Sequence, residues 1–151
     1  MKATQENVQT VAPQRAKNHL GVIHSDVCGP FDVSSLGGNK YFLTFVDEFT
    51  RKIWLYLLKK KKEVFSLFVK WCTCVERQFE WKLNILRIDG RLEFNSKHFH
   101  EYCVAKGIEY EIRAPYTPQH DGLAKRRNKT LLDMTRCMLK EKGLPYCFWV
   151  K

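Results

Sequence analysis

The sequence predicts a layered α/β domain, and three observations support that fold class. Three apolar runs, in which many residues are β-branched or aromatic, follow one another closely at residues 20–23, 41–46 and 53–58, and such runs favour strands. Apolar residues then recur every three or four positions, which is typical of an amphipathic helix. Strand and helix patterns alternate after that. We therefore expect the order β-β-β-α-β-α-β-α and a five-stranded mixed sheet with three antiparallel strands, flanked by helices.

Short polar turns separate the first three predicted strands. The first run leads into Asp26 and breaks at Gly29 and Pro30. Residues 36–40 contain two glycines and an asparagine, which supply turn chemistry, and residues 47–52 are polar. Because consecutive strands with short connections pair side by side, these three favour an antiparallel meander.

The second half of the chain alternates between the two patterns. Residues 83–88 and 108–112 predict the fourth and fifth strands. Ser96 is a suitable N-cap for a short helix that Gly107 closes, and residues 123–142 predict a long third helix. The first helix, of about four turns, is predicted from its apolar positions Val64, Phe65, Phe68, Cys72 and Val75.

Composition limits the class of protein. The 151 residues fit one domain, in which we expect residues 1–18 to be a loose leader and residues 19–151 the folded core. No run approaches the roughly 18 apolar residues that span a bilayer, and no secretory segment begins the chain, so we expect an intracellular protein without a membrane partner. The formal charge of +10 favours a polyanion partner, nucleic acid first, although a merely soluble basic protein is the alternative.

The cysteines do not favour a metal site. The chain has six cysteines and no C-x-x-C pair. Cys72 with Cys74 and His98 with His100 are conceivable half-sites for zinc, but on amphipathic helices such pairs are more often packing and surface residues.

Two carboxylates form the candidate site. Asp26 and Asp89 each follow an apolar strand run, from which they can project into one cleft and bind magnesium, as phosphoryl transfer with two metal ions requires. The alternative is that both are turn residues that end strands, and spacing alone favours that alternative.

Collinear motifs extend over most of the chain. They are His24-Ser25-Asp26-Val27-Cys28-Gly29-Pro30, residues 36–45 and 59–63, Ala114-Pro115-Tyr116-Thr117-Pro118-Gln119, Gly122, Ala124, Arg126, Asn128, Thr130, Gly143-Leu144-Pro145 and Phe148-Trp149. Together they resemble the catalytic core of Copia-type retrotransposon integrases over about residues 16–151. The resemblance implies an RNase H-like fold and magnesium-dependent strand transfer that joins element ends to target DNA. It also implies a nuclear location.

The third catalytic position departs from that family. The family's triad is two aspartates and a glutamate, and Asp26 and Asp89 match the first two. The third falls 35 residues after Asp89, where this chain has Lys125. A cation there supplies no oxygen ligand, and at about 4 Å with an effective dielectric near 20 each charge term is on the order of 4 kcal/mol. We expect weak magnesium binding and impaired catalysis.

Further departures accompany Lys125. The family's two adjacent glycines after the second aspartate are Arg91 and Leu92 here. Glu93 is retained, and Asp121, in place of an asparagine, is a weak candidate for a replacement carboxylate. The zinc-binding domain that precedes the core in the family is not represented in residues 1–18, and the core is expected to be truncated at its C-terminal end.

Basic residues beside the site suggest DNA contact. Arg126, Arg127 and Lys129 open the predicted long helix and can meet phosphates, although a solvated helix face is the alternative. The run 59–62 is interpreted as a solvated turn, and Trp54, Trp71, Trp81 and Trp149 as core residues. Two hypotheses result: an integrase core that transfers DNA strands, or a non-catalytic nucleic-acid-binding or assembly module derived from one. Association with further copies of the chain is left open.

Overall fold

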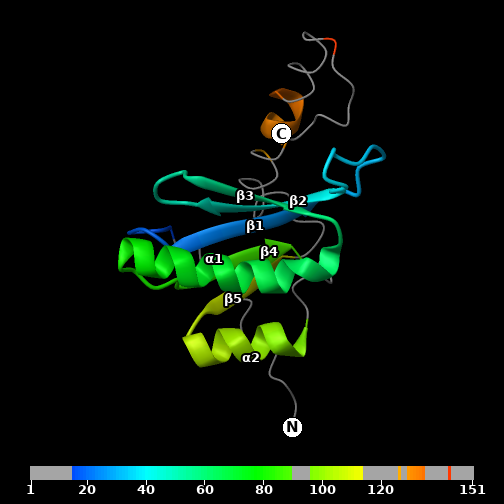
Figure 1. Cartoon of the computed structure of the whole chain (residues 1–151). Coiled ribbons are helices and arrows are strands. Elements are labelled where there is room, and N and C mark those ends of the chain that lie inside the picture. The colour runs from blue at the N-terminus through cyan, green and yellow to red at the C-terminus, as the bar shows by residue number, and fades with distance from the viewer. Residues whose placement is uncertain (1–14, 90–95, 114–125, 127–128, 135–142, 144–151) are drawn as a thin grey trace.

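The fold is taken from a computed structural model, which describes residues 15–89, 96–113, 126, 129–134 and 143 (Figure 1). Within these residues the elements follow the predicted order as far as the fifth strand. They are β1 (Val22–Cys28), β2 (Tyr41–Asp47), β3 (Ile53–Leu58), a short 3-10 helix (Lys61–Glu63), α1 (Val64–Phe79), β4 (Ile85–Asp89), α2 (Lys97–Lys106) and β5 (Glu109–Arg113).

The five strands form one mixed sheet in the order β3-β2-β1-β4-β5. β1 pairs with β2, and β2 with β3, in antiparallel fashion, so the predicted meander is confirmed. β4 lies parallel to both β1 and β5. Most of the predicted third helix falls outside the described residues, but Arg126 and residues 129–134 are helical.

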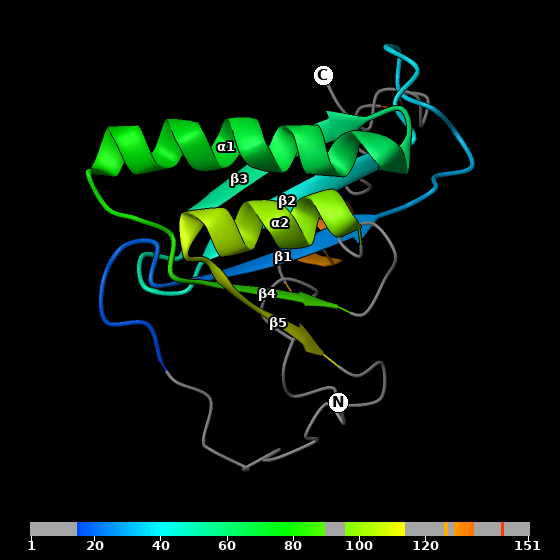
Figure 2. The same cartoon turned by 90° about the horizontal axis from the view of Figure 1, so that it is seen from below.

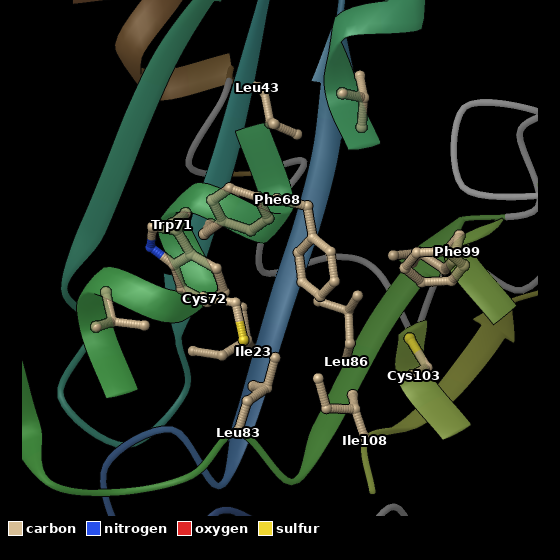
Figure 3. Packing of buried hydrophobic residues seen from close by; sticks show 14 of the residues in the cluster. Ile23, Leu43, Phe68, Trp71, Cys72, Leu83, Leu86, Phe99, Cys103 and Ile108 are labelled. Carbon is tan, nitrogen blue, oxygen red and sulfur yellow. The ribbon is translucent and has the colours of Figure 1, made fainter. Parts of the chain in front are cut away.

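Helices α1 and α2 cover the same face of the sheet (Figures 1 and 2). Their apolar sides meet the strands in one core, in which Phe68 and Trp71 of α1 and Phe99 of α2 lie against Ile23 and Leu86 of the central strands (Figure 3). The rings of Trp71 and Phe45 stack with centroids 4.1 Å apart. This core fixes β1 and β4 in the middle of the sheet.

The ends of α2 match the predicted capping. Ser96 is its N-cap, and its hydroxyl accepts a hydrogen bond from the backbone N–H of Phe99 at 3.1 Å. Gly107 follows the helix with φ at +69°, a conformation that favours glycine. The N-cap serine and the left-handed glycine act on residues close to them in the chain, so both could be predicted from the sequence.

One predicted core residue is not in the core. Trp71 is buried at 1% exposure, but Trp81 is 46% exposed, so the interpretation of Trp81 as a core residue is wrong. Trp81 follows the left-handed residue Glu80 that ends α1, in the connection to β4, where neither helix nor strand periodicity orients a side chain toward the sheet. Trp54 is partly buried against the core, and Trp149 lies outside the described residues.

Candidate active site

Asp26 occupies the interior of a central strand. It lies in β1, two residues before the strand ends at Cys28, and opposite Thr44 of β2. Only 7% of the residue is exposed. The alternative interpretation of Asp26 as a turn residue is therefore wrong. A carboxylate buried within a strand requires a positive partner or an ion to be stable in its charged form.

Asp89 stands at the same level on the neighbouring strand. The parallel ladder pairs Val22 with Ile85, Ile23 with Leu86 and His24 with Arg87, a constant offset of 63 residues. The same offset relates Asp26 to Asp89, since 89 − 26 = 63, two residues beyond the last pair of the ladder. Neighbouring strands are about 4.8 Å apart. Continued by two residues, this register brings the two aspartate positions to the same level, near the C-terminal ends of both strands.

The turn after β1 depends on glycine. Gly29 has φ at +127°, and a Cβ at this position would lie 2.5 Å from the carbonyl oxygen of Lys40. The backbone N–H of Phe31 donates to that same carbonyl at 2.9 Å. A side chain at Gly29 would push the chain away from the start of β2 and would disturb the strand that holds Asp26.

A row of charged residues lies two positions before the aspartates along the strands. His24 of β1, Arg87 of β4 and Glu111 of β5 are paired across the three strands. Arg87, 3% exposed, donates from Nε to Glu111 at 2.8 Å and from Nη1 to Oε2 of Glu48 at 2.9 Å. Nε2 of His24 lies 2.7 Å from the same oxygen of Glu48. These four residues are called the charged row below.

The charged row keeps Glu48 ionised. Burial by itself raises the pKa of this carboxyl group. The hydrogen bonds from His24 and from the backbone N–H of Ala16, together with the charges of His24 and Arg87, outweigh burial and lower the pKa below its ordinary value. Glu48 is therefore an anion at neutral pH.

The charged row as a unit could not be recognised from the sequence. Its members come from four separate segments, and Arg87 and Glu48 are 39 residues apart. One signal was present in the sequence: Arg87 interrupts the apolar run Ile85, Leu86 and Ile88, and a cation in a buried strand needs anionic partners. Which anions those are depends on the order of the strands.

The remaining predicted site residues are only partly described. Arg126 and Lys129 are exposed on helical backbone. Lys125, Arg127, Arg91, Leu92, Glu93 and Asp121 lie outside the described residues. Within the described part of the chain no group of three His, Cys, Asp or Glu side chains has the geometry to hold a metal ion.

The two pairs considered for zinc lie in unlike surroundings. Cys72 is buried and Cys74 is exposed, and burial raises the pKa of the Cys72 thiol to about 11, which disfavours the thiolate that zinc requires. His98 is exposed, and Nδ1 of His100 lies 2.8 Å from the hydroxyl of Tyr110. Among the residues described here, no helix has the length and apolar character to cross a membrane.

Comparisons with protein families and with curated proteins identify relatives of this chain. The family model described as the integrase core domain matches residues 16–118. The chain is 47% identical over 136 residues to the retrovirus-related Pol polyprotein from transposon TNT 1-94 of Nicotiana tabacum. It is 32% identical over 130 residues to the corresponding polyprotein from transposon RE2 of Arabidopsis thaliana. These matches cover 90% and 86% of this chain, but only 10% and 9% of the two polyproteins.

Solved structures share the fold. A chain of the simian T-cell lymphotropic virus intasome, in complex with the PP2A regulatory subunit B56 gamma, aligns with a TM-score of 0.70 and 16% identity. That alignment covers 90% of this chain and 47% of that one. The HTLV-2 integrase catalytic core domain, in complex with magnesium in a dimeric form, aligns with a TM-score of 0.62 and 18% identity over 89% of this chain and 83% of that one. At these identities the likeness establishes the fold, which is RNase H-like as expected.

Proposed function

The chain belongs to the integrase core domain family, and from that premise we propose that it is the catalytic core of a Copia-type retrotransposon integrase whose strand-transfer activity Lys125 has impaired. The observation that supports the proposal best is the register of β1 with β4, which brings Asp26 level with Asp89 when it is continued by two residues. Asp26 and Asp89 are also the two residues that match the aspartates of the family's triad. Such an agreement between motif and strand register is not expected by chance. The 47% identity to a transposon Pol polyprotein supports the same lineage.

The two aspartates suit a magnesium ion. Magnesium prefers oxygen ligands and retains several waters, so one or two carboxylates are a sufficient protein contribution. Asp26 offers a carboxylate held by a buried central strand, and Asp89 ends the neighbouring strand. A bound ion would supply Lewis-acid stabilisation of charge on the phosphate and would help to form the nucleophile. Lys125 offers no oxygen ligand and adds a like charge, so binding should be weak.

The basic residues after position 125 are proposed to hold DNA. Arg126 and Lys129 are exposed, and Arg127 lies between them in the sequence. Contacts from such residues go to phosphates and carry no sequence information. In the proposed function they orient DNA beside the two aspartates, whether or not a strand is transferred.

A second candidate function is a non-catalytic nucleic-acid-binding or assembly module. Lys125 favours it, because the loss of one metal ligand removes chemistry without removing the fold or the positive charge. The two candidates differ in one measurable property, which is divalent-metal binding after the third ligand is restored.

The test is a magnesium titration and a strand-transfer assay of the chain and its Lys125→Glu variant. We expect no magnesium-dependent nicking or strand transfer by the unmodified chain, and divalent metal binding at least about tenfold tighter in Lys125→Glu. The control is Lys125→Glu combined with Asp26→Asn, in which the gain should vanish.

Two outcomes would contradict the proposal. Robust activity in the unmodified chain that Asp89→Asn abolishes would mean that Asp121 or Glu93 supplies the third carboxylate. Equal metal binding by the unmodified chain and by Lys125→Glu would mean that position 125 is not part of a metal site, and the module would then be the better description.

A further inference from the structure

The charged row adjoins the two aspartates along the sheet. His24 and Arg87 are paired across β1 and β4, and Asp26 and Asp89 follow each of them by two residues. Two residues along a strand span about 6.6 Å. Along β4 the backbone of Arg87, which is 3% exposed, therefore lies within one Debye length of the backbone of Asp89, and buried charges are screened less than exposed ones over such a distance.

Glu48 reaches this row from outside the two strands. It follows β2, and one of its oxygens, Oε2, lies 2.7 Å from Nε2 of His24 and 2.9 Å from Nη1 of Arg87. Its other oxygen accepts the backbone N–H of Ala16 at 3.3 Å. A single carboxylate thus joins β1 to β4 at the level immediately before the aspartates.

Glu48 and Glu111 together neutralise Arg87. Two carboxylates flank one guanidinium group, at 2.9 and 2.8 Å. Without Glu48, Arg87 would retain one of these partners and would present more positive charge toward a cation two residues away. Groups that hydrogen-bond directly to metal ligands typically change metal affinity by about 10- to 100-fold when they are altered, so a group that acts one step further out is expected at the lower end of that range.

We propose that Glu48 is a positioning residue of the metal site: its carboxylate ties His24 of β1 to Arg87 of β4, keeps Asp26 and Asp89 level, and prevents the Arg87 charge from repelling the metal ion. The inference rests on the proposed function, since it assigns Glu48 a role toward the ion that the two aspartates would hold. Glu48 itself is not a catalytic residue, because it acts through His24 and Arg87.

The experiment measures manganese(II) affinity in the 151-residue chain with Lys125→Glu as the parent. Glu48→Gln is compared with Glu101→Gln, which removes the same charge from an exposed position on α2. Titrations are run well below the unfolding temperature of each variant, so that a loss of stability alone leaves the affinity unchanged. We expect affinity about tenfold weaker in Glu48→Gln and unchanged in Glu101→Gln.

Amide hydrogen exchange in β1 and β4 gives a second readout that needs no metal. We expect faster exchange at the shared ladder of these strands in Glu48→Gln than in Glu101→Gln. If Glu48→Gln does not fold, Glu111→Gln replaces it, because it removes the other carboxylate that flanks Arg87 from the edge strand β5. The same loss of affinity is expected.

The outcomes separate this inference from the proposed function. Tight manganese binding by the parent that Asp26→Asn abolishes, with equal affinities in Glu48→Gln and Glu101→Gln, would overturn the role of Glu48 and leave the metal site standing. A parent that binds no manganese would overturn the metal site, and the role of Glu48 would be overturned with it.

Discussion

Arg87 illustrates how one buried charge determines its surroundings. A guanidinium group at 3% exposure is costly unless anions lie within hydrogen-bonding distance. Glu48 and Glu111 meet that need, and both oxygens of Glu48 are engaged by other residues as well. Removing one partner of such a group is more costly than the net contribution of the pair, because the remaining charge stays buried.

The lowered pKa of Glu48 leads to a prediction about acid stability. A carboxyl group whose folded-state pKa is depressed stabilises the fold above its unfolded pKa, here about 4.5, and that contribution is lost as the pH falls through the folded-state value. Chemical unfolding of the chain and of Glu48→Gln should therefore differ most at neutral pH. The difference in the free energy of unfolding should shrink as the pH falls below about 4.5 and through the lowered pKa of Glu48.

Glu101→Gln is the matched control for that measurement. Its side chain is exposed and pairs with Lys97 at 3.8 Å on the surface of α2. Exposed pairs of this kind contribute little. A pH-independent difference between the chain and Glu48→Gln would mean that the ionised carboxylate is not what stabilises the fold.

At the residue scale, the sequence could point to residues that are marked by their immediate neighbours in the chain. Asp26 and Asp89 became candidates because each follows a predicted strand run and matches a family motif. The partners of Arg87 could not be found in the same way, because Glu48 and Glu111 are 39 and 24 residues away and meet it only after the strands are ordered. Hydrogen bonds between distant segments leave no periodic pattern.

At the scale of elements, local signals in the sequence predicted the ends of helix α2 better than they predicted which side chains are buried. The cap at Ser96 and the left-handed Gly107 were both predicted and both observed. The strand predicted at residues 83–88 instead runs from Ile85 to Asp89, a shift of two residues at its start and one at its end. The exposure of Trp81 could not be predicted, since an aromatic residue in a connection has no periodic face.

The two tryptophans give a paired test of packing. Trp71 of α1 stacks on Phe45 and is 1% exposed, whereas Trp81 is 46% exposed. Replacing a buried tryptophan with alanine removes its burial and leaves a cavity, so Trp71→Ala should lower the free energy of unfolding by about 3–5 kcal/mol. Trp81→Ala should change it by about 0.5 kcal/mol or less. Urea unfolding measures both, and a larger cost at Trp81 would contradict the described arrangement of the connection between α1 and β4.

At the scale of the whole molecule, the sequence predicted which elements exist but not by itself which strands are neighbours. The meander followed from short polar turns between the first three strands. The insertion of β1 between β2 and β4 joins segments 63 residues apart and was implied only by the family resemblance. That insertion is what places the candidate aspartates beside each other.

The net charge of +10 leads to the last prediction, which concerns DNA affinity. If phosphate contacts dominate, binding should be weak and tolerant of sequence, and the logarithm of affinity should fall linearly with the logarithm of salt, by about 0.9 for each phosphate contact on duplex DNA. Replacing Arg126, Arg127 and Lys129 with alanine should weaken binding equally across DNA sequences and reduce the salt slope by roughly 3.

Lys59, Lys60 and Lys62 provide the control for that prediction. They are exposed in and beside the short 3-10 helix, and their replacement with alanine removes the same three charges from another part of the molecule. Fluorescence anisotropy with several unrelated duplexes, between about 50 and 200 mM salt, measures both triple variants. Because only contacts that release counterions contribute to the slope, the control should keep the slope of the parent while losing a little affinity through the weaker overall field. Equal slopes in the two variants would place the DNA contacts elsewhere, and an affinity insensitive to salt would exclude phosphate contacts as the basis of binding.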